Sequence, residues 1–193
     1  MKPILLDPTS EFETERLTIR FYRPGDGALA QAAYVEGGEH VHQWVGWADP
    51  KLTLEEAEEQ IRKGYAAFLT HERFPFFFFL KGSSTLVGMT ALHHIDWDVP
   101  KFEIGYLVLP RFEGQGYCGE VVRWITHLAF DCLSARRVEI RTNHHNERSY
   151  RVAERAGFQF EGVLSNYWRS TQGELIDIRM YSKTRPDGET KAD

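Results

Sequence analysis

The sequence predicts a mixed α/β fold with a mostly antiparallel central sheet of about seven strands and about four flanking helices. Three observations predict it. Short stretches with the period-two alternation or the continuous apolar character of strands recur along the chain. Helical segments separate only the later strands, so the early ones are expected to pair as antiparallel neighbours. Finally, 193 residues of which 42% are hydrophobic and 26% are charged suit one globular domain, which we place at residues 11–183.

The first predicted strand covers residues 16–22, "RLTIRFY", where every second residue is apolar and "RPGDG" then breaks the pattern. A helix is expected over residues 27–36, because Gly37 and Gly38 follow it and glycine commonly ends helices. In residues 39–50 the apolar residues follow neither the helical nor the strand periodicity. This segment is expected to form an ordered loop.

The second helix is predicted at residues 53–69, where a Thr-x-x-Glu capping box precedes apolar residues at helical spacing. The run "FPFFFFL" at residues 74–80 is typical of a strand covered on both faces. A "KGSS" turn joins it to a strand at residues 85–93, which predicts a hairpin. A further strand is expected at residues 101–109.

The second half of the chain alternates helices and strands. Apolar residues at helical spacing predict a helix over residues 117–133, and "RRVEIRT" at 136–142 is a short strand. A helix at 147–156 is closed by the next glycine, and strands follow at 159–165 and 175–181. Residues 184–193 form a predicted polar tail.

The stretch "GQGYCGE", residues 114–120, contains the pattern G-x-G-x-x-G. A dinucleotide-binding loop with this pattern follows its strand directly and has an acidic residue about 20 positions later. Glu139 has that spacing from Gly119, but it lies mid-strand, where alternation predicts a solvent-facing side chain, and Pro110 and three further residues separate the strand from the loop. Dinucleotide binding and an incidental turn remain alternatives.

A third interpretation of the glycine stretch is a pyrophosphate cradle. A helix that begins near Tyr117 leaves its first amides without partners. Glycines at positions 114, 116 and 119 would let phosphate oxygens approach those amides closely. This interpretation predicts a phosphate-bearing cosubstrate.

The residues around this stretch resemble the GNAT (Gcn5-related N-acetyltransferase) superfamily. Its acetyl-CoA signature, Q/R-x-x-G-x-G/A, is matched by Arg111, Gly114 and Gly116 in "RFEGQG". The order "FEIGYLVLP", "GQGYCGE", "NERS" and "RAGFQFEG" looks like the RimJ/RimL-type branch, and the resemblance covers about residues 11–183. It implies a GNAT fold and an acetyl-CoA-dependent N-acetyltransferase, without a metal, whose acceptor is a primary amine, foremost a protein N-terminal α-amine.

Two other functions stay open at this point. The acceptor could be a small amine, such as an antibiotic, a polyamine or an amino-acid derivative. Alternatively, the chain could be a non-catalytic acyl-CoA-binding sensor. Ala153 stands where many relatives have a tyrosine that acts as the general acid, and Glu113 stands where relatives often have arginine.

The resemblance also implies the residues that hold acetyl-CoA. Val108 and Leu109 would offer backbone groups to the pantetheine arm and the thioester oxygen. Amides of residues 113–119 would hold the pyrophosphate, and Asn146 would contact the pantetheine chain. The predicted cofactor-binding residues are Val108, Leu109, Arg111, Glu113, Gly114, Gln115, Gly116, Tyr117, Cys118, Gly119, Asn146 and Ser149.

Two residues are predicted to be catalytic. Glu103, in "FEIGY", is the candidate base that takes the proton from the acceptor amine, and an exposed strand glutamate is the alternative. Ser149 matches the branch's serine near the thioester sulfur. Because Ala153 replaces the tyrosine, Ser149 is expected to relay a hydrogen bond, with water or an inward-pointing Tyr150 as alternatives.

Several further expectations concern the surroundings of this site. The carboxylate of Glu113 is expected to point to solvent, and Arg111, Arg148 and Arg151 to supply positive charge toward the phosphates. Cys118 is expected to be a small helix residue rather than a nucleophile.

The histidines and tryptophans give weaker expectations. The adjacent pairs 93–94 and 144–145 should have diverging side chains, so no metal site is predicted. Trp44, Trp47 and Trp168 would either wall the acceptor site or belong to the core.

Composition limits the partners. The net charge of −5 argues against nucleic-acid binding and suits an amine-bearing partner. Neither a signal-peptide core nor a membrane-spanning run is present, so a cytoplasmic monomer or homodimer that binds no membrane is expected. Cys118 and Cys132, about 20 Å apart on one predicted helix, should not form a disulfide.

Overall fold

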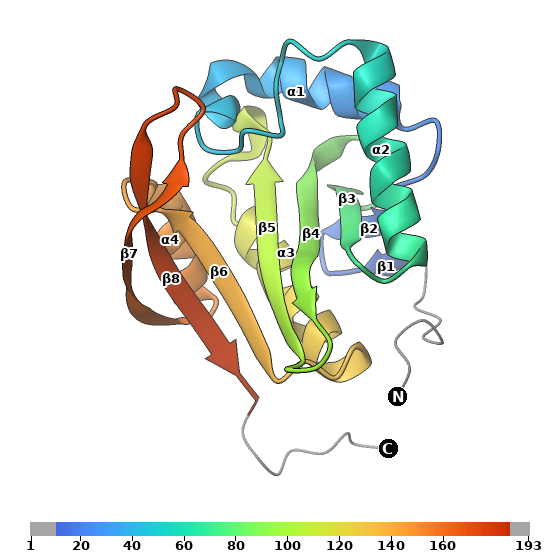
Figure 1. Cartoon of the computed structure of the whole chain (residues 1–193). Helices are drawn as coiled ribbons and strands as arrows, with labels where there is room; N and C mark the ends of the chain where they lie inside the picture. The colour runs from blue at the N-terminus through green and yellow to red at the C-terminus, as the bar shows by residue number, and fades with distance from the viewer. Residues whose placement is uncertain (1–10, 186–193) are drawn as a thin grey trace.

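A computed structural model describes residues 11–185, which form one twisted sheet of 8 strands with helices on both faces (Figure 1). The strands are β1 (Glu11–Glu13), β2 (Leu17–Phe21), β3 (Phe74–Leu80), β4 (Leu86–Asp96), β5 (Lys101–Val108), β6 (Arg137–Asn143), β7 (Gln159–Arg169) and β8 (Leu175–Thr184). The helices are α1 (Gly27–His42), α2 (Leu54–Leu69), α3 (Tyr117–His127) and α4 (Glu147–Arg155), with a 3-10 turn at Pro110–Phe112 and a π-helical turn at Leu128–Cys132. The predicted fold class is confirmed.

The strand order is β1-β2-β3-β4-β5-β6-β8-β7. Neighbouring strands are antiparallel except β5 and β6, which run parallel and pair only between Lys101–Glu103 and Arg137–Glu139. Beyond Glu103 these two strands separate, as Figure 1 shows. The sheet therefore opens between β5 and β6.

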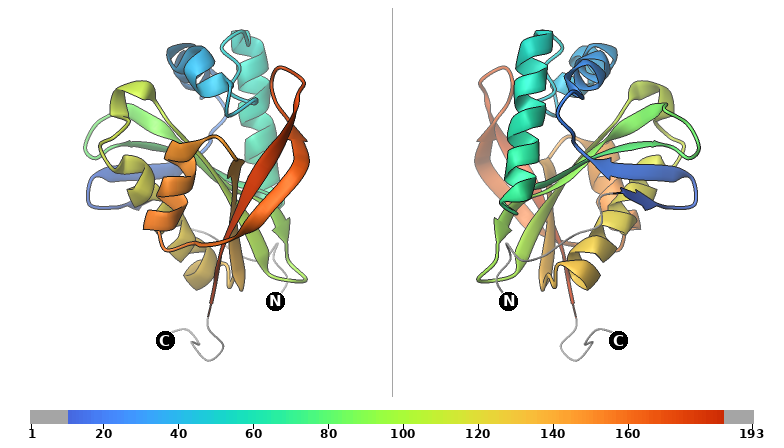
Figure 2. Two further views of the ribbon diagram at one scale, coloured as in Figure 1. Left: turned by 90° about the vertical axis from the view of Figure 1, so that its left-hand side faces the viewer. Right: turned by 90° about the vertical axis from the view of Figure 1, so that its right-hand side faces the viewer.

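Two cores hold the helices on opposite faces of the sheet (Figure 2). Phe102 and Ile104 of β5 pack with the apolar face of α3, whereas Leu107 lies in the core beneath α1 and α2. The run Phe74–Leu80 has alternate side chains in the two cores, as its continuous apolar sequence predicted. Consequently, each residue of β5 faces one helical layer or the other by parity.

Local sequence signals account for several element boundaries. Thr53 accepts from the amide of Glu56, and the Glu56 side chain accepts from the amide of Thr53, so the predicted capping box is present at α2. Both cysteines are free, as expected from their spacing.

Some boundaries differ from prediction. β1 is an additional strand, so the sheet has one more strand than expected. The predicted loop at 39–50 begins as helix, because α1 continues to His42 after a kink at Gly38, where φ is 50°. β7 continues to Arg169, four residues beyond the predicted end, since polar residues on an exposed edge strand obscure the pattern.

Residues 1–10 and 186–193 lie outside the described part of the chain, and with them the expectation about the amino-terminal sequence and most of the predicted polar tail. Thr184, the first residue of that tail, still belongs to β8. Within residues 11–185 no helix is both long and apolar enough to cross a bilayer.

Candidate active site

A cleft of about 1850 Å³ lies where β5 and β6 separate. It reaches from the glycine stretch before α3, past β5, to the loop after α1 and the hairpin between β7 and β8. The predicted site residues that line it are Glu103, Val108, Glu113, Gly114, Gly116, Cys118, Gly119, Asn146 and Ser149. Leu109, Arg111, Gln115 and Tyr117 are not among its lining residues.

The glycine stretch forms a turn before α3 whose amides have no acceptor. Gly114 and Gly116 have φ values of 74° and 83°, in the left-handed region that favours glycine. No residue in the described part of the chain accepts from the amides of residues 114–119, whereas the amide of Glu120 donates to Gly116 O at 3.1 Å. The stretch therefore presents a row of free donors at a helix N-terminus, which fits a pyrophosphate group.

At the end of β5, the backbone amides of Val108 and Leu109 point in opposite directions, although both residues were predicted to contact acetyl-CoA. The amide of Leu109 donates to Val87 O at 2.9 Å, and its side chain is buried in the core, so Leu109 cannot offer its amide to a thioester. Because successive amides of a strand point to opposite sides, the amide of Val108 faces the gap toward β6. Of the two, only Val108 retains the predicted role.

Positive charge near the glycine stretch comes from residues that sequence reasoning missed. Arg16 donates through Nη1 to Gln115 O at 2.9 Å and through Nε to Glu120 at 2.7 Å. Burial opposes ionisation of Glu120, but bonds from Thr14 and Arg16 outweigh it and lower its pKa. Arg123 lines the cleft beside Gly119 and has no ion-pair partner among residues 11–185.

The predicted phosphate-facing arginines are engaged elsewhere. Arg111 pairs with Glu36 at 3.2 Å and does not line the cleft. Arg151 pairs with Glu147 one turn away at 2.8 Å.

Glu113 does not point to solvent. Its Oε1 lies 2.8 Å from His40 Nε2, and its Oε2 is paired with Arg148. The expectation was wrong because α1 continues past its kink and brings His40 to this loop. The carboxylate is thereby neutralised at the rim of the cleft, and Arg148 is occupied by it.

Asn146 and Ser149 occupy the start of α4. Asn146 Oδ1 caps the helix by accepting from the amide of Ser149 at 3.1 Å, which leaves its amide nitrogen free to donate to a ligand. Ser149 Oγ lies 3.0 Å from the hydroxyl of Tyr106, which also donates to Ser149 O at 3.0 Å. Burial raises the pKa of Tyr106, so the pair stays neutral and can hold a hydroxyl proton toward the cleft.

Tyr150, the side-chain alternative to Ser149, does not face the cleft, whereas water stays an alternative. Ala153 is fully buried. Tyr150 donates to Glu147 at 3.1 Å and lies beneath the guanidinium of Arg179, and it does not line the cleft, so it does not point inward as the alternative required. Burial raises the pKa of Cys118 to about 12, which agrees with a small helix residue rather than a nucleophile.

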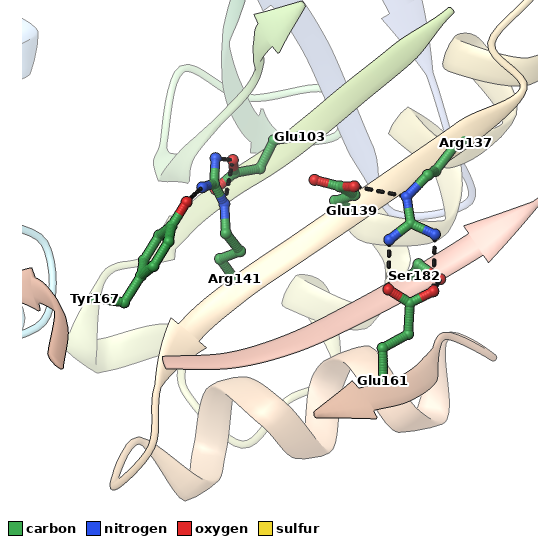
Figure 3. Close-up of polar contacts among 7 residues, drawn as sticks. All are labelled: Glu103, Arg137, Glu139, Arg141, Glu161, Tyr167 and Ser182. Atoms are coloured by element: carbon green, nitrogen blue, oxygen red, sulfur yellow. Dashed lines mark hydrogen bonds and ion pairs between the residues drawn. The ribbon is translucent and has the colours of Figure 1, made fainter. Parts of the chain in front are cut away.

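Glu103 lies at the floor of the cleft on β5. Its side chain is only 3% exposed, so the alternative of an exposed strand glutamate is wrong. Arg141 of β6 donates through Nε to Glu103 Oε2 at 2.7 Å and through Nη1 to the hydroxyl of Tyr167 at 2.7 Å (Figure 3). Every hydrogen bond to Glu103 uses Oε2, which leaves Oε1 without a partner in the described chain.

The adjacent histidines of β4 converge rather than diverge. The β4–β5 register shifts after His93, and His94 takes a left-handed φ of 47°, so this bulge turns both rings to the same side. Their Nδ1 atoms lie 2.9 Å apart, and His94 Nδ1 lies 3.0 Å from Glu103 Oε2. Burial first, and then the neighbouring His94 and arginines, lower the pKa of His93 to about 3, so His93 is neutral.

The convergence groups potential metal ligands. His93, His94 and Glu103 each offer one such atom, all within 4.8 Å of one another. The guanidinium of Arg141 also contacts Glu103 and lies 3.1 Å from His94 Nδ1, so a cationic side chain already occupies this position. Hydrogen bonding to Glu103 outweighs burial and raises the pKa of Arg141, which keeps that charge in place.

Glu139, the residue with dinucleotide-type spacing, is buried rather than solvent-facing. It accepts from Arg137 Nε at 2.6 Å, and Arg137 also pairs with Glu161, which accepts from Ser182 (Figure 3). The prediction was wrong because the alternation alone does not show the Arg137 side chain bonded to Glu139, or Ser182 of β8 paired with it across the sheet. Glu139 is thus a structural ion-pair residue.

The three tryptophans line the cleft, which favours the acceptor wall over the core. Trp44 and Trp47 are each 39% exposed. A Cβ at Gly46 between them would lie 3.4 Å from Thr171 Cγ2, so the loop after α1 approaches the β7–β8 hairpin. These segments wall one side of the cleft.

Sequence reasoning missed Tyr106, Arg141 and His94. Tyr106 could have been found by parity, because it lies on the opposite face of β5 from Glu103. Arg141 required the parallel β5–β6 register, and His94 required the bulge, neither of which has a local sequence signal.

Comparisons with known proteins agree with the fold. The model of the acetyltransferase (GNAT) domain matches residues 16–159. YdaF of Bacillus subtilis (strain 168), to which a ribosomal N-acetyltransferase activity is ascribed, is 31% identical over 152 residues, covering 77% of this chain and 80% of YdaF.

Solved structures show the same architecture. RimL, a ribosomal L7/L12 alpha-N-protein acetyltransferase in complex with coenzyme A, superposes with a TM-score of 0.81 at 19% identity over 89% of this chain and 95% of that one. A ribosomal-protein-S5-alanine acetyltransferase from Vibrio fischeri gives 0.82 at 19% identity over 94% and 100%. The chain belongs to the GNAT family of acetyl-CoA-dependent N-acetyltransferases.

Proposed function

We propose that this N-acetyltransferase transfers the acetyl group of acetyl-CoA to the α-amine of a protein or peptide N-terminus, with Glu103 as the base. The observation that carries the proposal is the unbonded Oε1 of Glu103 at the floor of a cleft open to the donor cradle and to the tryptophan-lined side. The ribosomal N-acetyltransferase activity ascribed to YdaF supports an acceptor of this kind.

An α-amine suits a single carboxylate base better than a lysine side chain does. The ordinary pKa of an α-amine is about 7.7–8.0, against about 10.4 for lysine, so far less free energy is needed to remove its proton near neutral pH. Glu103 would accept that proton through Oε1, directly or through one water, while Arg141 fixes the carboxylate through Oε2.

A separate set of residues would bind acetyl-CoA, the acetyl donor, and assist the departure of its thiolate. Bound acetyl-CoA would supply an activated thioester, held by the amides of residues 114–119 and by the gap-facing amide of Val108. Ser149, positioned by Tyr106, would donate a hydrogen bond to the departing thiolate. Tyr106 has a raised pKa, so we assign it to positioning rather than to full proton transfer.

The test is thiol release from acetyl-CoA with matched peptides. One peptide has a free N-terminus and an internal lysine, the second has a blocked N-terminus and the same lysine, and small amines form a third group. We expect release with the free N-terminus only, and mass spectrometry should place the acetyl group on the α-amine. Release with the blocked peptide, or with small amines alone, would overturn the assignment of the acceptor.

A further inference from the structure

Arginines dominate the charge of the cleft although the chain as a whole carries −5. Its lining includes eight arginines but only three carboxylates, Glu103, Glu113 and Glu147. Each of these carboxylates already has an arginine partner. The arginines that line the cleft are Arg16, Arg73, Arg123, Arg141, Arg148, Arg151, Arg155 and Arg169. The cleft therefore has cationic charge left over for a ligand.

Arg73 is a cation of the cleft that lies away from the expected acetyl-CoA cradle. It directly precedes β3, and extending the register from Phe74 opposite Leu92 places it opposite His93, which is itself opposite Glu103. The three side chains therefore share the face of the sheet beneath α1 and α2, with about 4.8 Å between neighbouring strands. The glycine cradle lies before α3, which packs on the other face.

No carboxylate in residues 11–185 neutralises Arg73. Its Nε is buried without a hydrogen-bond partner, although the side chain lines the cleft. Asp26 is a carboxylate near Arg73, since both residues act electrostatically on Tyr22. It is already bound by Arg20, which donates two hydrogen bonds to it at 2.7 and 2.8 Å. A half-buried guanidinium without a counter-ion is costly, so this position is suited to an anion brought by a ligand.

The other groups around Arg73 are neutral. Burial raises the pKa of Tyr22 to about 12, and the Coulombic effect of Arg73 only partly offsets this. His93, between Arg73 and Glu103, is neutral as described above. Positive charge on this side of the floor thus comes from Arg73, while Arg141 is already matched by Glu103.

We infer that Arg73 binds a carboxylate of the acceptor, so that the preferred substrate is an amine bearing a nearby acid group. This deepens the proposed function and rests on it: the acceptor amine would lie at Glu103 and its carboxylate at Arg73, across His93. Two sources share this chemistry, a peptide N-terminus followed by an acidic residue and a free amino acid. A guanidinium–carboxylate pair also supplies directional hydrogen bonds, which would orient the amine toward the base.

The experiment compares each acid with its amide. One arm uses peptides that begin Ser-Asp or Ser-Asn, and the other uses free amino acids and their carboxamides. We expect the acid member to have a KM roughly 10- to 100-fold lower than its amide, the range of a charge-assisted hydrogen bond. A larger ratio in the peptide arm supports both the inference and the proposed acceptor, whereas a larger ratio for the free amino acids keeps the role of Arg73 and overturns the assignment of a protein N-terminus.

Variants locate the effect. Arg73→Met should abolish the difference between acid and amide, Arg73→Lys should retain part of it, and the control Arg62→Met, on the exposed face of α2, should leave it unchanged. The thermal midpoint and the Kd for coenzyme A check that each variant is folded. Should Arg73→Met fail to fold, the comparison of acid and amide in the wild-type protein and in Arg73→Lys still decides.

The outcomes separate the inference from the proposed function. Equal KM values for acid and amide, or an unchanged preference in Arg73→Met, overturn the inference while acetyl transfer stands. Absence of thiol release with every acceptor overturns the proposed function. In that case the Kd values of acid and amide for the coenzyme A-loaded protein, measured by calorimetry, still test whether Arg73 selects the carboxylate.

Discussion

Two arginines four residues apart on β6 form ion-pair clusters with opposite properties (Figure 3). Arg137 lies where β5 and β6 still pair, and its partner Glu161 uses both oxygens, with Ser182 as a further donor. Arg141 lies where the strands have separated, and its partner Glu103 leaves one oxygen unbonded in the cleft. The same chemical pair is therefore saturated at the closed end of the sheet and available to a ligand at the open end.

The largest expected effect comes from removing each carboxylate in turn. Glu103→Gln should lower kcat/KM about 10²- to 10⁴-fold, because it removes the proposed general base. The matched change Glu161→Gln should leave turnover within about twofold, since Glu161 does not line the cleft. Steady-state thiol release and coenzyme A binding by calorimetry measure both.

Binding decides how that result is interpreted. Glu103→Gln should bind coenzyme A as tightly as the wild-type protein does. A parallel loss of binding would mean that the variant disrupts the cleft, and equal losses of turnover in the two variants would remove the functional difference between the clusters.

A smaller effect is expected on the opposite face of β5. Ser149→Ala should lower kcat about tenfold, the effect of one hydrogen bond to a charged group, and Tyr106→Phe should lower it less. Tyr150→Phe is the matched control, because Tyr150 does not line the cleft and its hydroxyl bonds to Glu147 rather than to Ser149. Single-turnover rates at saturating acetyl-CoA distinguish the three. If Tyr150→Phe had the strongest effect, the assignment of the proton relay would be wrong.

An effect of similar size, on coenzyme A binding rather than on turnover, is expected from substitution in the glycine cradle. Gly116 and Gly173 have φ values of 83° and 87°, so alanine should cost about 1–2 kcal/mol of stability at either position. Only Gly116→Ala should also weaken coenzyme A binding, by roughly tenfold, because its Cβ, 3.4 Å from Arg16 Nη2, would crowd the stretch that carries the free amides. Chemical denaturation and calorimetry check the two quantities. Equal Kd values in both variants would exclude the cradle.

The smallest effect concerns acid stability at the closed end. Hydrogen bonding to Arg137 and then to Ser182 lowers the pKa of Glu161 from its ordinary 4.5 to about 2. A lowered folded-state pKa contributes stability above pH 4.5 that is lost as the pH falls toward 2. Glu161 is 40% exposed, so solvent screening limits this contribution to about 1 kcal/mol or less.

The measurement is the thermal midpoint between pH 5 and pH 2. The wild-type protein should lose more stability across this window than Glu161→Gln, and the two should converge near pH 2. Parallel curves would show that this ion pair contributes nothing.

The sequence predicted features that are encoded locally. The Thr53 capping box, the doubly buried Phe74–Leu80 and the glycine turn before Tyr117 each follow from a few adjacent residues. Glu103 was found from the motif around it, although its burial was not. Local patterns therefore located the cleft and one catalytic candidate.

What sequence reasoning missed depends on long-range register. Arg141 reaches Glu103 only because β5 and β6 run parallel over three residue pairs, and Arg73 faces the same floor only through the pairing of β3 with β4. Glu113 was misassigned for the same reason, since its partner His40 arrives from a helix 73 positions earlier in the chain. Such contacts are set by the fold as a whole rather than by neighbouring residues.

The most direct test of the central assignment, that Glu103 removes the proton of the acceptor amine, is the ratio of kcat/KM between the wild-type protein and Glu103→Gln for acceptors of decreasing amine pKa. Acceptors from a lysine-like amine near 10.4 down to α-amines near 7.7–8.0 and weaker bases need progressively less help from a base. The ratio should be largest for the most basic amine that is accepted and should fall steadily along the series. A ratio that stays constant, or that remains near one throughout, would contradict the role of Glu103.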